Sequence, residues 1–223
     1  MAIKIHGVSF STCTARVVAV LNEKGVEYEL IGVNLPKGEH KQPPFLALNP
    51  FGQIPVLEDG DLRLYETRAI TKYLAYKYKD QGTDLVRIID PKYVALVNVW
   101  AEVEAQHFNA AVAPLVEELL IKPRVLQLPP DEAEAEIYAE KLDKVLTVYE
   151  ERLSKSKYLA GDYFSLADLH HLPYLHCLLK TSRASLVTSR PHVLAWWEDI
   201  SSRPAWVKTA EGMKFWDAPP QSA

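Results

Sequence analysis

The 223-residue chain predicts two parts of different class, an α/β domain over residues 1–80 and an all-helical domain over residues 93–223. Three observations support this division. Strand and helix patterns alternate in the first 80 residues, a stretch mixing Gly, Asp and Pro follows, and no strand pattern appears after it. A chain of this length suits one large domain or two small ones, with ample length for a core. We therefore expect residues 81–92 to be a linker.

The first domain has the predicted order βαβ, then a short helix, then ββα. Strand patterns cover residues 3–5, 28–35, 54–59 and 62–66. Helical patterns cover residues 15–24, 42–50 and 67–78. Gly25 stands where the C-cap of the first helix belongs. Asp59-Gly60-Asp61 joins the last two strands and is typical of a hairpin turn.

Helical patterns fill the second domain. They cover residues 93–121, 132–153, 165–180 and 192–202. In FSLADL, Ser165 stands three residues before Asp168 at the start of an apolar run, which is the spacing of a capping box. We therefore interpret Asp168 as a capping residue rather than a catalytic carboxylate.

Composition argues against several classes of protein. The net charge is −4, and the small basic cluster His40-Lys41 is too short to bind a polyanion, so we expect no nucleic-acid partner. No stretch approaches the roughly 18 apolar residues of a membrane span, and the N-terminus lacks the pattern of a signal peptide. Cys13 and Cys177 alone make neither a disulfide framework nor a metal site. These features favour a soluble intracellular protein.

The segment VSFSTCTAR, residues 8–16, crowds three hydroxyls and a thiol into one helical turn. Ser11 has no visible general base nearby, which argues against acyl transfer. Thr12 and Thr14 are suited to capping the helix. Cys13 has two readings, a partly buried core thiol, which is favoured, and a thiol made reactive by the helix N-terminus. Cys177 lies in an apolar helix and is interpreted as core.

The segment NPFGQIPVLEDG, residues 49–60, places a proline at the start of a strand. Proline cannot donate to a strand ladder, and the X-Pro bond is the one that readily becomes cis. A cis turn at Pro55 would leave the preceding N–H and C=O free to pair with an extended peptide. A simple turn proline at an edge strand explains the same residues, so both readings remain open.

Charged and hydroxyl side chains at two further places suit an amino-acid ligand. In LYETRAI, Thr67 begins a helix, where its hydroxyl caps the helix or, with the first N–H groups, holds a carboxylate. Glu66 beside it is suited to pair with an ammonium. His40 and Lys41 lie in a loop, either as solvated surface or as partners of a second carboxylate.

These pieces together resemble a known family. GEHKQPPFLALNPFGQIPVLEDGDLRLYETRAITKYLAYKY, YLAGDYFSLADL and PHVLAWWEDISSRPAW resemble the plant cytosolic glutathione transferases of the phi class, and the likeness covers nearly the whole chain. The resemblance implies a thioredoxin-like N-terminal domain, an all-α C-terminal domain, a homodimer, a cytosolic location and a role in detoxification or stress response. Phe51 resembles an aromatic residue that packs into the partner subunit; the alternative is an ordinary core phenylalanine.

The resemblance also assigns roles to single residues. Ser11 matches the serine that activates the glutathione thiol. The glutathione-binding positions are matched by His40 and Lys41 for the glycyl carboxylate, Gln53, Ile54 and cis-Pro55 for the cysteinyl backbone, and Glu66 and Thr67 for the γ-glutamyl head. The family usually has serine at position 67. Threonine keeps the hydroxyl, so we expect binding to survive. Arg16 is expected to have a structural or dimer role rather than a catalytic one.

The implied function is conjugation of glutathione, as co-substrate and without a tightly bound cofactor or metal, to hydrophobic electrophiles. Peroxidase activity with organic hydroperoxides is a further implication. The expected acceptor site lies between the domains, with Phe10, Thr12, Leu35, Leu115, Leu119 and Leu178 as candidate walls. Two alternatives are a weakly catalytic carrier of flavonoids or other hydrophobic ligands, and a docking module. The complete set of glutathione-binding residues argues against the docking module.

Overall fold

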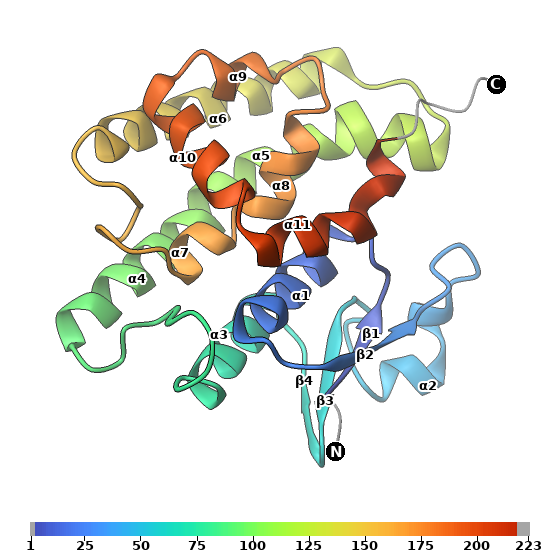
Figure 1. Cartoon of the computed structure of the whole chain (residues 1–223). Coiled ribbons are helices and arrows are strands. Elements are labelled where there is room, and N and C mark those ends of the chain that lie inside the picture. Colours follow the sequence, from blue (N-terminus) through green and yellow to red (C-terminus); the bar gives the residue numbers. More distant parts are fainter. Residues whose placement is uncertain (1–2, 218–223) are drawn as a thin grey trace. The chain divides into compact units, whose positions relative to one another are not determined.

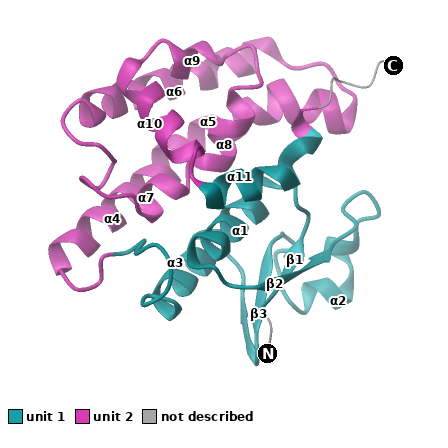
Figure 2. Ribbon diagram, viewed as in Figure 1, with its two compact units in different colours: residues 1–86, 204–215 teal, residues 87–203, 216–223 magenta. Residues whose placement is uncertain are grey.

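The computed structural model describes residues 3–217, which fall into two compact units (Figure 2). Of the described residues, unit 1 takes residues 3–86 together with Pro204–Phe215, and unit 2 takes Arg87–Arg203 with Trp216 and Asp217. The division at Val86 lies within the expected linker, residues 81–92. The segment Pro204–Phe215 departs from the expected helical domain 93–223, because its helix α11 (Pro204–Ala210) packs against α1 (Thr12–Lys24) of unit 1.

Unit 1 is built on a four-stranded sheet with the order β2-β1-β3-β4. Its strands are β1 (Ile3–Gly7), β2 (Tyr28–Gly32), β3 (Val56–Asp59) and β4 (Leu62–Leu64). β2 is parallel to β1, whereas β3 is antiparallel to both β1 and β4. Helix α3 (Thr67–Lys77) packs against α1, as Figure 1 shows. The thioredoxin-like arrangement implied by the sequence is confirmed.

The sequence explains both ends of α1. Ser11 is its N-cap, and Gly25 ends it with a φ of 62°, a left-handed conformation that glycine adopts without strain. Nearly every side chain between them is buried, including Arg16 at 1% exposure, which fits a structural role for that residue. Lys24 is buried as well. Burial lowers the pKa of this ammonium, which donates to the Thr83 carbonyl at 2.6 Å.

One continuous helical stretch opens unit 2. It contains α4 (Pro91–Val103) and α5 (Asn109–Val116), with π-helical turns at Glu104–Phe108 and Glu117–Leu126. The helical pattern in the sequence predicts one helix over residues 93–121. The stretch continues to Leu126, with Pro114 and Pro123 inside it. Proline lacks the N–H that an α-helical bond requires, and at Pro123 the chain takes the wider π-helical turn instead.

The rest of unit 2 is also helical. It contains α6 (Glu132–Leu153), α7 (Leu166–Leu169), α8 (Leu172–Leu178), α9 (Ser185–Thr188) and α10 (Pro191–Ser201). α6 has the predicted bounds. The helix expected over residues 165–180 is divided into α7 and α8, and Pro173 lies in the first turn of α8, where its missing N–H is tolerated. α9 was not predicted, because four residues show no periodicity.

The predicted capping box at the start of α7 is confirmed. The Ser165 hydroxyl accepts from the Ala167 N–H at 3.2 Å, and the Asp168 carboxylate accepts from the Ser165 N–H at 3.0 Å. Asp168 also accepts from the Leu159 N–H and the Trp196 indole N–H, both at 3.0 Å. Burial raises the pKa of Asp168 to about 6, and these donors oppose the shift. Asp168 is therefore a structural centre of unit 2.

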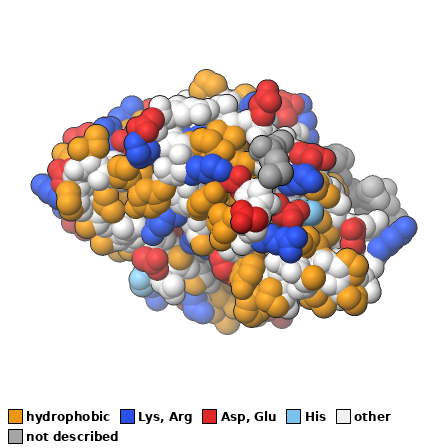
Figure 3. All heavy atoms as spheres, turned by 90° about the horizontal axis from the view of Figure 1, so that it is seen from below, with side chains coloured by type: hydrophobic (Ala, Val, Ile, Leu, Met, Phe, Trp, Pro, Cys, Tyr) orange, Lys and Arg blue, Asp and Glu red, His pale blue; other side chains and the backbone are white. Residues whose placement is uncertain are grey.

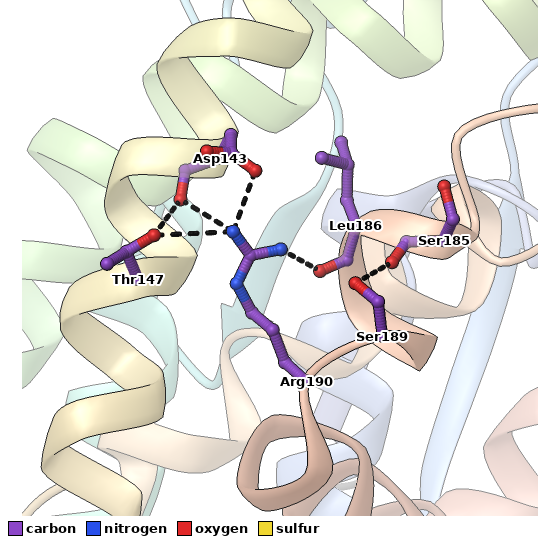
Figure 4. A network of polar contacts seen from close by, with 6 residues as sticks. All are labelled: Asp143, Thr147, Ser185, Leu186, Ser189 and Arg190. Atoms are coloured by element: carbon purple, nitrogen blue, oxygen red, sulfur yellow. Dashed lines mark hydrogen bonds and ion pairs between the residues drawn. The ribbon is translucent and has the colours of Figure 1, made fainter.

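A second polar network in unit 2 surrounds Arg190 (Figure 4). One guanidinium nitrogen donates to the Asp143 carboxylate at 2.7 Å and to the Thr147 hydroxyl at 3.3 Å, both on α6. The other donates to the Leu186 carbonyl at 2.6 Å, on α9. Ser189 donates to the Ser185 carbonyl at 2.6 Å. Arg190 therefore joins α6 to α9 and satisfies a carbonyl that the short helix leaves unpaired.

We expect Arg190→Ala to lower the free energy of unfolding by about 2 kcal/mol, because it removes several hydrogen bonds to a charged donor. Thermal unfolding would show this as a fall in Tm of about 4–8 °C. Arg190→Lys should keep only part of the stability that the alanine variant loses, since lysine has no planar fork of donors with which to bond both helices. Lys155→Ala is the control, because that exposed pair with Glu151 contributes little. Equal Tm values for the Arg190 and Lys155 variants would contradict the prediction.

The surface drawn in Figure 3 mixes acidic, basic and apolar side chains, with Lys and Arg scattered among the others. Within residues 3–217, no helix combines the length and the apolar character needed to cross a membrane. The same residues contain no group of three or more His, Cys, Asp or Glu side chains suited to hold a metal ion.

Candidate active site

A cleft of about 380 Å³ lies within unit 1. Seven of the eight residues expected to bind glutathione line it: His40, Lys41, Gln53, Ile54, Pro55, Glu66 and Thr67. The other lining residues are Cys13, Leu35, Asn49, Gly52 and Arg68. Ser11 is not among the lining residues, although Cys13, two positions further along the chain, is. The cleft therefore gathers residues from the α1 N-terminus, the β2–β3 connection and the α3 N-terminus.

Ser11 is held at the first turn of α1. Its backbone is extended, with φ −69° and ψ 129°, and its N–H donates to the Val8 carbonyl at 3.1 Å. The hydroxyl oxygen accepts from the Thr14 N–H at 3.4 Å, which is long for such a bond. Since this contact uses a lone pair, the hydroxyl hydrogen is left to donate elsewhere. Cys13 is partly buried, as expected, and it also lines the cleft.

The start of α3 has an unusual backbone. Glu66, its N-cap residue, has φ 68° and ψ 103°, and its side chain makes no capping bond. A positive φ is uncommon outside glycine, and such residues cluster at functional sites. Thr67 is the first residue inside the helix, at 9% exposure, so the simple capping role is not realised. The first turn of α3 is therefore presented to the cleft.

His40 and Lys41 lie in the short 3₁₀ turn Glu39–Lys41. The Lys41 ammonium donates to the Gly52 carbonyl at 2.7 Å and to the Phe51 carbonyl at 3.2 Å, so it is not simply solvated. The His40 Nδ1 atom is buried and has no hydrogen-bond partner among residues 3–217. A buried polar atom without a partner is unfavourable.

Asn49, which is 2% exposed, fixes the loop that precedes β3. Its amide donates to the Gln53 carbonyl at 2.7 Å, and its oxygen accepts from the Phe51 N–H at 3.0 Å. The Ile54-Pro55 bond is cis, as the resemblance implied. A Cβ at Gly52 would lie 2.7 Å from the His40 carbonyl oxygen, so only glycine fits. Sequence reasoning missed Asn49, although Asn before Pro favours such an Asx turn.

The electrostatics of the cleft favour a ligand with more than one anionic group. The N-termini of α1 and α3 border it, and each carries a partial positive charge. Lys41 and Arg68 add full positive charges. Among the described lining residues, Glu66 is the one acid. An extended ligand with two carboxylates and one ammonium complements this set. Arg68 was also missed, because nothing in its helical position marks it.

The residues predicted to line the acceptor site differ in how accessible they are to a ligand. Leu35 lines the cleft, and Phe10 stacks on Phe215 with ring centroids 4.7 Å apart. Leu115 and Leu178 have no exposed surface, so a ligand cannot reach them and these two assignments are wrong. Thr12 is 8% exposed and Leu119 is partly exposed.

Phe51 is 64% exposed and makes an edge contact with Tyr65, so it is not a core residue.

Comparison with known proteins identifies the family. Residues 1–76 match the model of the glutathione S-transferase N-terminal domain, and residues 103–204 match that of the C-terminal domain. Glutathione S-transferase F13 of Arabidopsis thaliana is 51% identical over 213 residues, 96% of this chain and 97% of that relative. The crystal structure of glutathione transferase F7 from Populus trichocarpa is 56% identical with a TM-score of 0.93, covering 95% of this chain and 99% of that chain.

A further solved structure shows what one relative binds. Glutathione S-transferase I from maize, in complex with an atrazine glutathione conjugate, is 44% identical with a TM-score of 0.89. It covers 96% of this chain and 99% of its own. The family models and these relatives identify the same family, and the residues of the cleft are compatible with it. The chain therefore belongs to the glutathione S-transferase family of enzymes, in the phi class to which its plant relatives belong.

Proposed function

We propose that the enzyme conjugates glutathione to hydrophobic electrophiles in the unit 1 cleft, with the Ser11 hydroxyl holding the glutathione sulfur as thiolate. The observation that carries this proposal is the charge pattern of the cleft, two helix N-termini and two cations with one carboxylate. Glutathione has two carboxylates and one ammonium and matches that pattern. The maize relative bound to a glutathione conjugate supports the same ligand.

Each part of glutathione has a proposed partner. Glu66 pairs with the γ-glutamyl ammonium, while the Thr67 hydroxyl and the first N–H groups of α3 hold the adjacent carboxylate. Gln53, Ile54 and cis-Pro55 pair with the cysteinyl backbone, as an added strand would. His40 and Lys41 receive the glycyl carboxylate. The sulfur then lies toward the α1 N-terminus, next to Ser11.

Activation needs a donor and no base. A free thiol has a pKa of about 8.5, so only a few per cent is thiolate at about pH 7. Lowering that pKa by about two units needs roughly 2.7 kcal/mol of preferential stabilisation of the thiolate. One charge-assisted hydrogen bond from Ser11 and the positive end of α1 together supply a stabilisation of that order. A base is not required, because solvent takes the proton.

The thiolate then reacts as the nucleophile. With an aryl halide, the sulfur forms a bond to the ring carbon and halide leaves with the bonding electrons. With an organic hydroperoxide, the sulfur attacks the terminal oxygen, the alcohol leaves, and a second glutathione completes the disulfide and releases water. The second reaction is the proposed peroxidase activity. The partly buried apolar residues Phe10 and Leu35, of which Leu35 lines the cleft, suit hydrophobic acceptors of both kinds.

Phe51 suggests the assembly. A ring that is 64% exposed beside the binding loop is suited to insert into a second subunit, and Lys41 bonds the Phe51 carbonyl directly. We propose a homodimer in which this residue is a contact, in the cytosol, as the family resemblance implies.

The first test is conjugation of glutathione to a simple aryl halide, together with calorimetric binding of glutathione. The proposal expects both turnover and binding. Binding of glutathione and of a flavonoid without turnover would favour the carrier function. No binding of glutathione would contradict the assignment of the cleft.

A second test addresses the glutathione head group. We expect Thr67→Ala to raise the Kd of glutathione about tenfold, because it removes one hydrogen bond to a charged group. The maximal rate at saturating glutathione should change much less, since the sulfur is not touched. Thr67→Ser is the matched control and should bind like the wild type. An unchanged Kd in the alanine variant would exclude Thr67 from the head-group site.

A further inference from the structure

The segment Pro204–Phe215 follows the helices of unit 2 in sequence but belongs to unit 1. In Figure 1 its helix α11 lies beside α1, and the two helices pack together. Trp206, Thr209 and Met213 are buried at 3%, 4% and 0% exposure. The Asn22 amide of α1 donates to the Thr209 hydroxyl at 2.9 Å. The segment is therefore firmly attached to the helix whose N-cap is Ser11.

The end of this segment contacts the turn that precedes Ser11. The ring of Phe215 stacks on the ring of Phe10, with centroids 4.7 Å apart and planes 29° from parallel. The backbone of Gly212 lies against Ser9, so that a Cβ at position 212 would be 3.0 Å from the Ser9 Cβ. Gly212 has no positive φ, so space and not backbone conformation explains the glycine. Two neighbours of Ser11 thus rest on the C-terminal segment.

The Ser11 hydroxyl itself is weakly fixed by its own helix. Its capping contact with the Thr14 N–H is 3.4 Å long, and the turn is closed by one bond of 3.1 Å from the Ser11 N–H to the Val8 carbonyl. A thiolate must be met by the hydroxyl at a short distance to be stabilised. Small displacements of such a donor reduce catalysis strongly. The contacts of Phe215 and Gly212 with the turn before Ser11 therefore affect the direction in which the Ser11 hydroxyl points.

From these contacts we infer that Phe215 and Gly212 are positioning residues for Ser11, acting through Phe10 and Ser9. The inference rests on the proposed function, because it concerns the thiol that Ser11 activates. It adds that the C-terminal segment, far from Ser11 in sequence, sets the pKa of the bound thiol. Val207 lies on α11, is 51% exposed and serves as a control position.

The test is a titration of bound glutathione without any acceptor, followed by the ultraviolet absorbance of the thiolate. Omitting the acceptor separates positioning of Ser11 from binding of an electrophile to Phe10. Phe215→Ala is expected to raise the thiol pKa and lower the conjugation rate about tenfold near neutral pH. Phe215→Tyr keeps the stacked ring and should restore both values. Val207→Ala should match the wild type, and all variants should bind glutathione within about twofold of it.

A double-mutant cycle with Ser11→Ala completes the test. If Phe215 acts through Ser11, Phe215→Ala has no further effect once the hydroxyl is gone. Gly212→Val should behave like Phe215→Ala, because it displaces Ser9. An equal loss in the presence and absence of the Ser11 hydroxyl, or an unchanged thiol pKa, would overturn the inference. Failure of the proposed function is seen separately, as absent turnover in the wild type or full activity in Ser11→Ala alone.

Discussion

Replacing Ser11 with alanine is expected to lower kcat/KM for glutathione conjugation by about 10- to 100-fold near neutral pH. The loss corresponds to one hydrogen bond from a neutral donor to a charged sulfur. The Kd of glutathione should change little, because Lys41, Gln53, Glu66 and Thr67, which line the cleft, are the residues proposed to hold the rest of the molecule. The measurement is the initial rate with a simple aryl halide at saturating glutathione.

Cys13→Ala is the matched control for this prediction. Cys13 lines the cleft and lies two residues from Ser11, so its removal tests the competing thiol. The cysteine variant is expected to keep most of the conjugation rate. Loss of the rate in Cys13→Ala with a fully active Ser11→Ala would contradict the prediction. Such a result would favour a thiol transferase in which Cys13 forms a mixed disulfide with glutathione.

The second large effect is expected at Asp168. Asp168→Asn should lower the free energy of unfolding by about 3 kcal/mol or more, because an amide turns a donor toward N–H groups that need an acceptor. The side chain is fully buried and accepts from Leu159, Ser165 and Trp196. Thermal unfolding should show a fall in Tm of about 6–12 °C.

Asp131→Ala is the control for Asp168. Asp131 also begins a helix and accepts from the N–H groups of Ala133 and Glu134, both at 3.0 Å, but it is exposed. Its removal should lower the free energy of unfolding by only about 1 kcal/mol. Similar losses at the two positions would show that burial of Asp168 adds nothing beyond an ordinary cap.

Local signals made much of the fold predictable. The helices α1, α6 and α7 were predictable from helical periodicity, from the cap at Gly25 and from the Ser165–Asp168 spacing. Each of these signals depends only on residues that are close in sequence. The return of Pro204–Phe215 to unit 1 was not predictable, because it depends on Thr209 meeting Asn22, 187 residues earlier. The π-helical turns around Pro123 were missed for a related reason, since propensity indicates only that a proline ends a helix.

The site was partly predictable as well. Seven expected glutathione-binding residues line one cleft, and they were found from the resemblance together with the chemistry of their side chains. Asn49 and Arg68 were missed, because their roles depend on how the β2–β3 connection and α3 meet in space. Leu115 and Leu178 were assigned to the acceptor site from apolar character alone, which does not distinguish a pocket wall from the core.

The most direct measurement of the central claim is the apparent pKa of the glutathione thiol bound to the wild type and to Ser11→Ala. The wild type is expected to lower this pKa by about two units below the free value of about 8.5. The variant should have a higher pKa, so its conjugation rate should approach that of the wild type as pH rises and the thiol ionises unaided. The same thiol pKa in both proteins would contradict activation by the Ser11 hydroxyl.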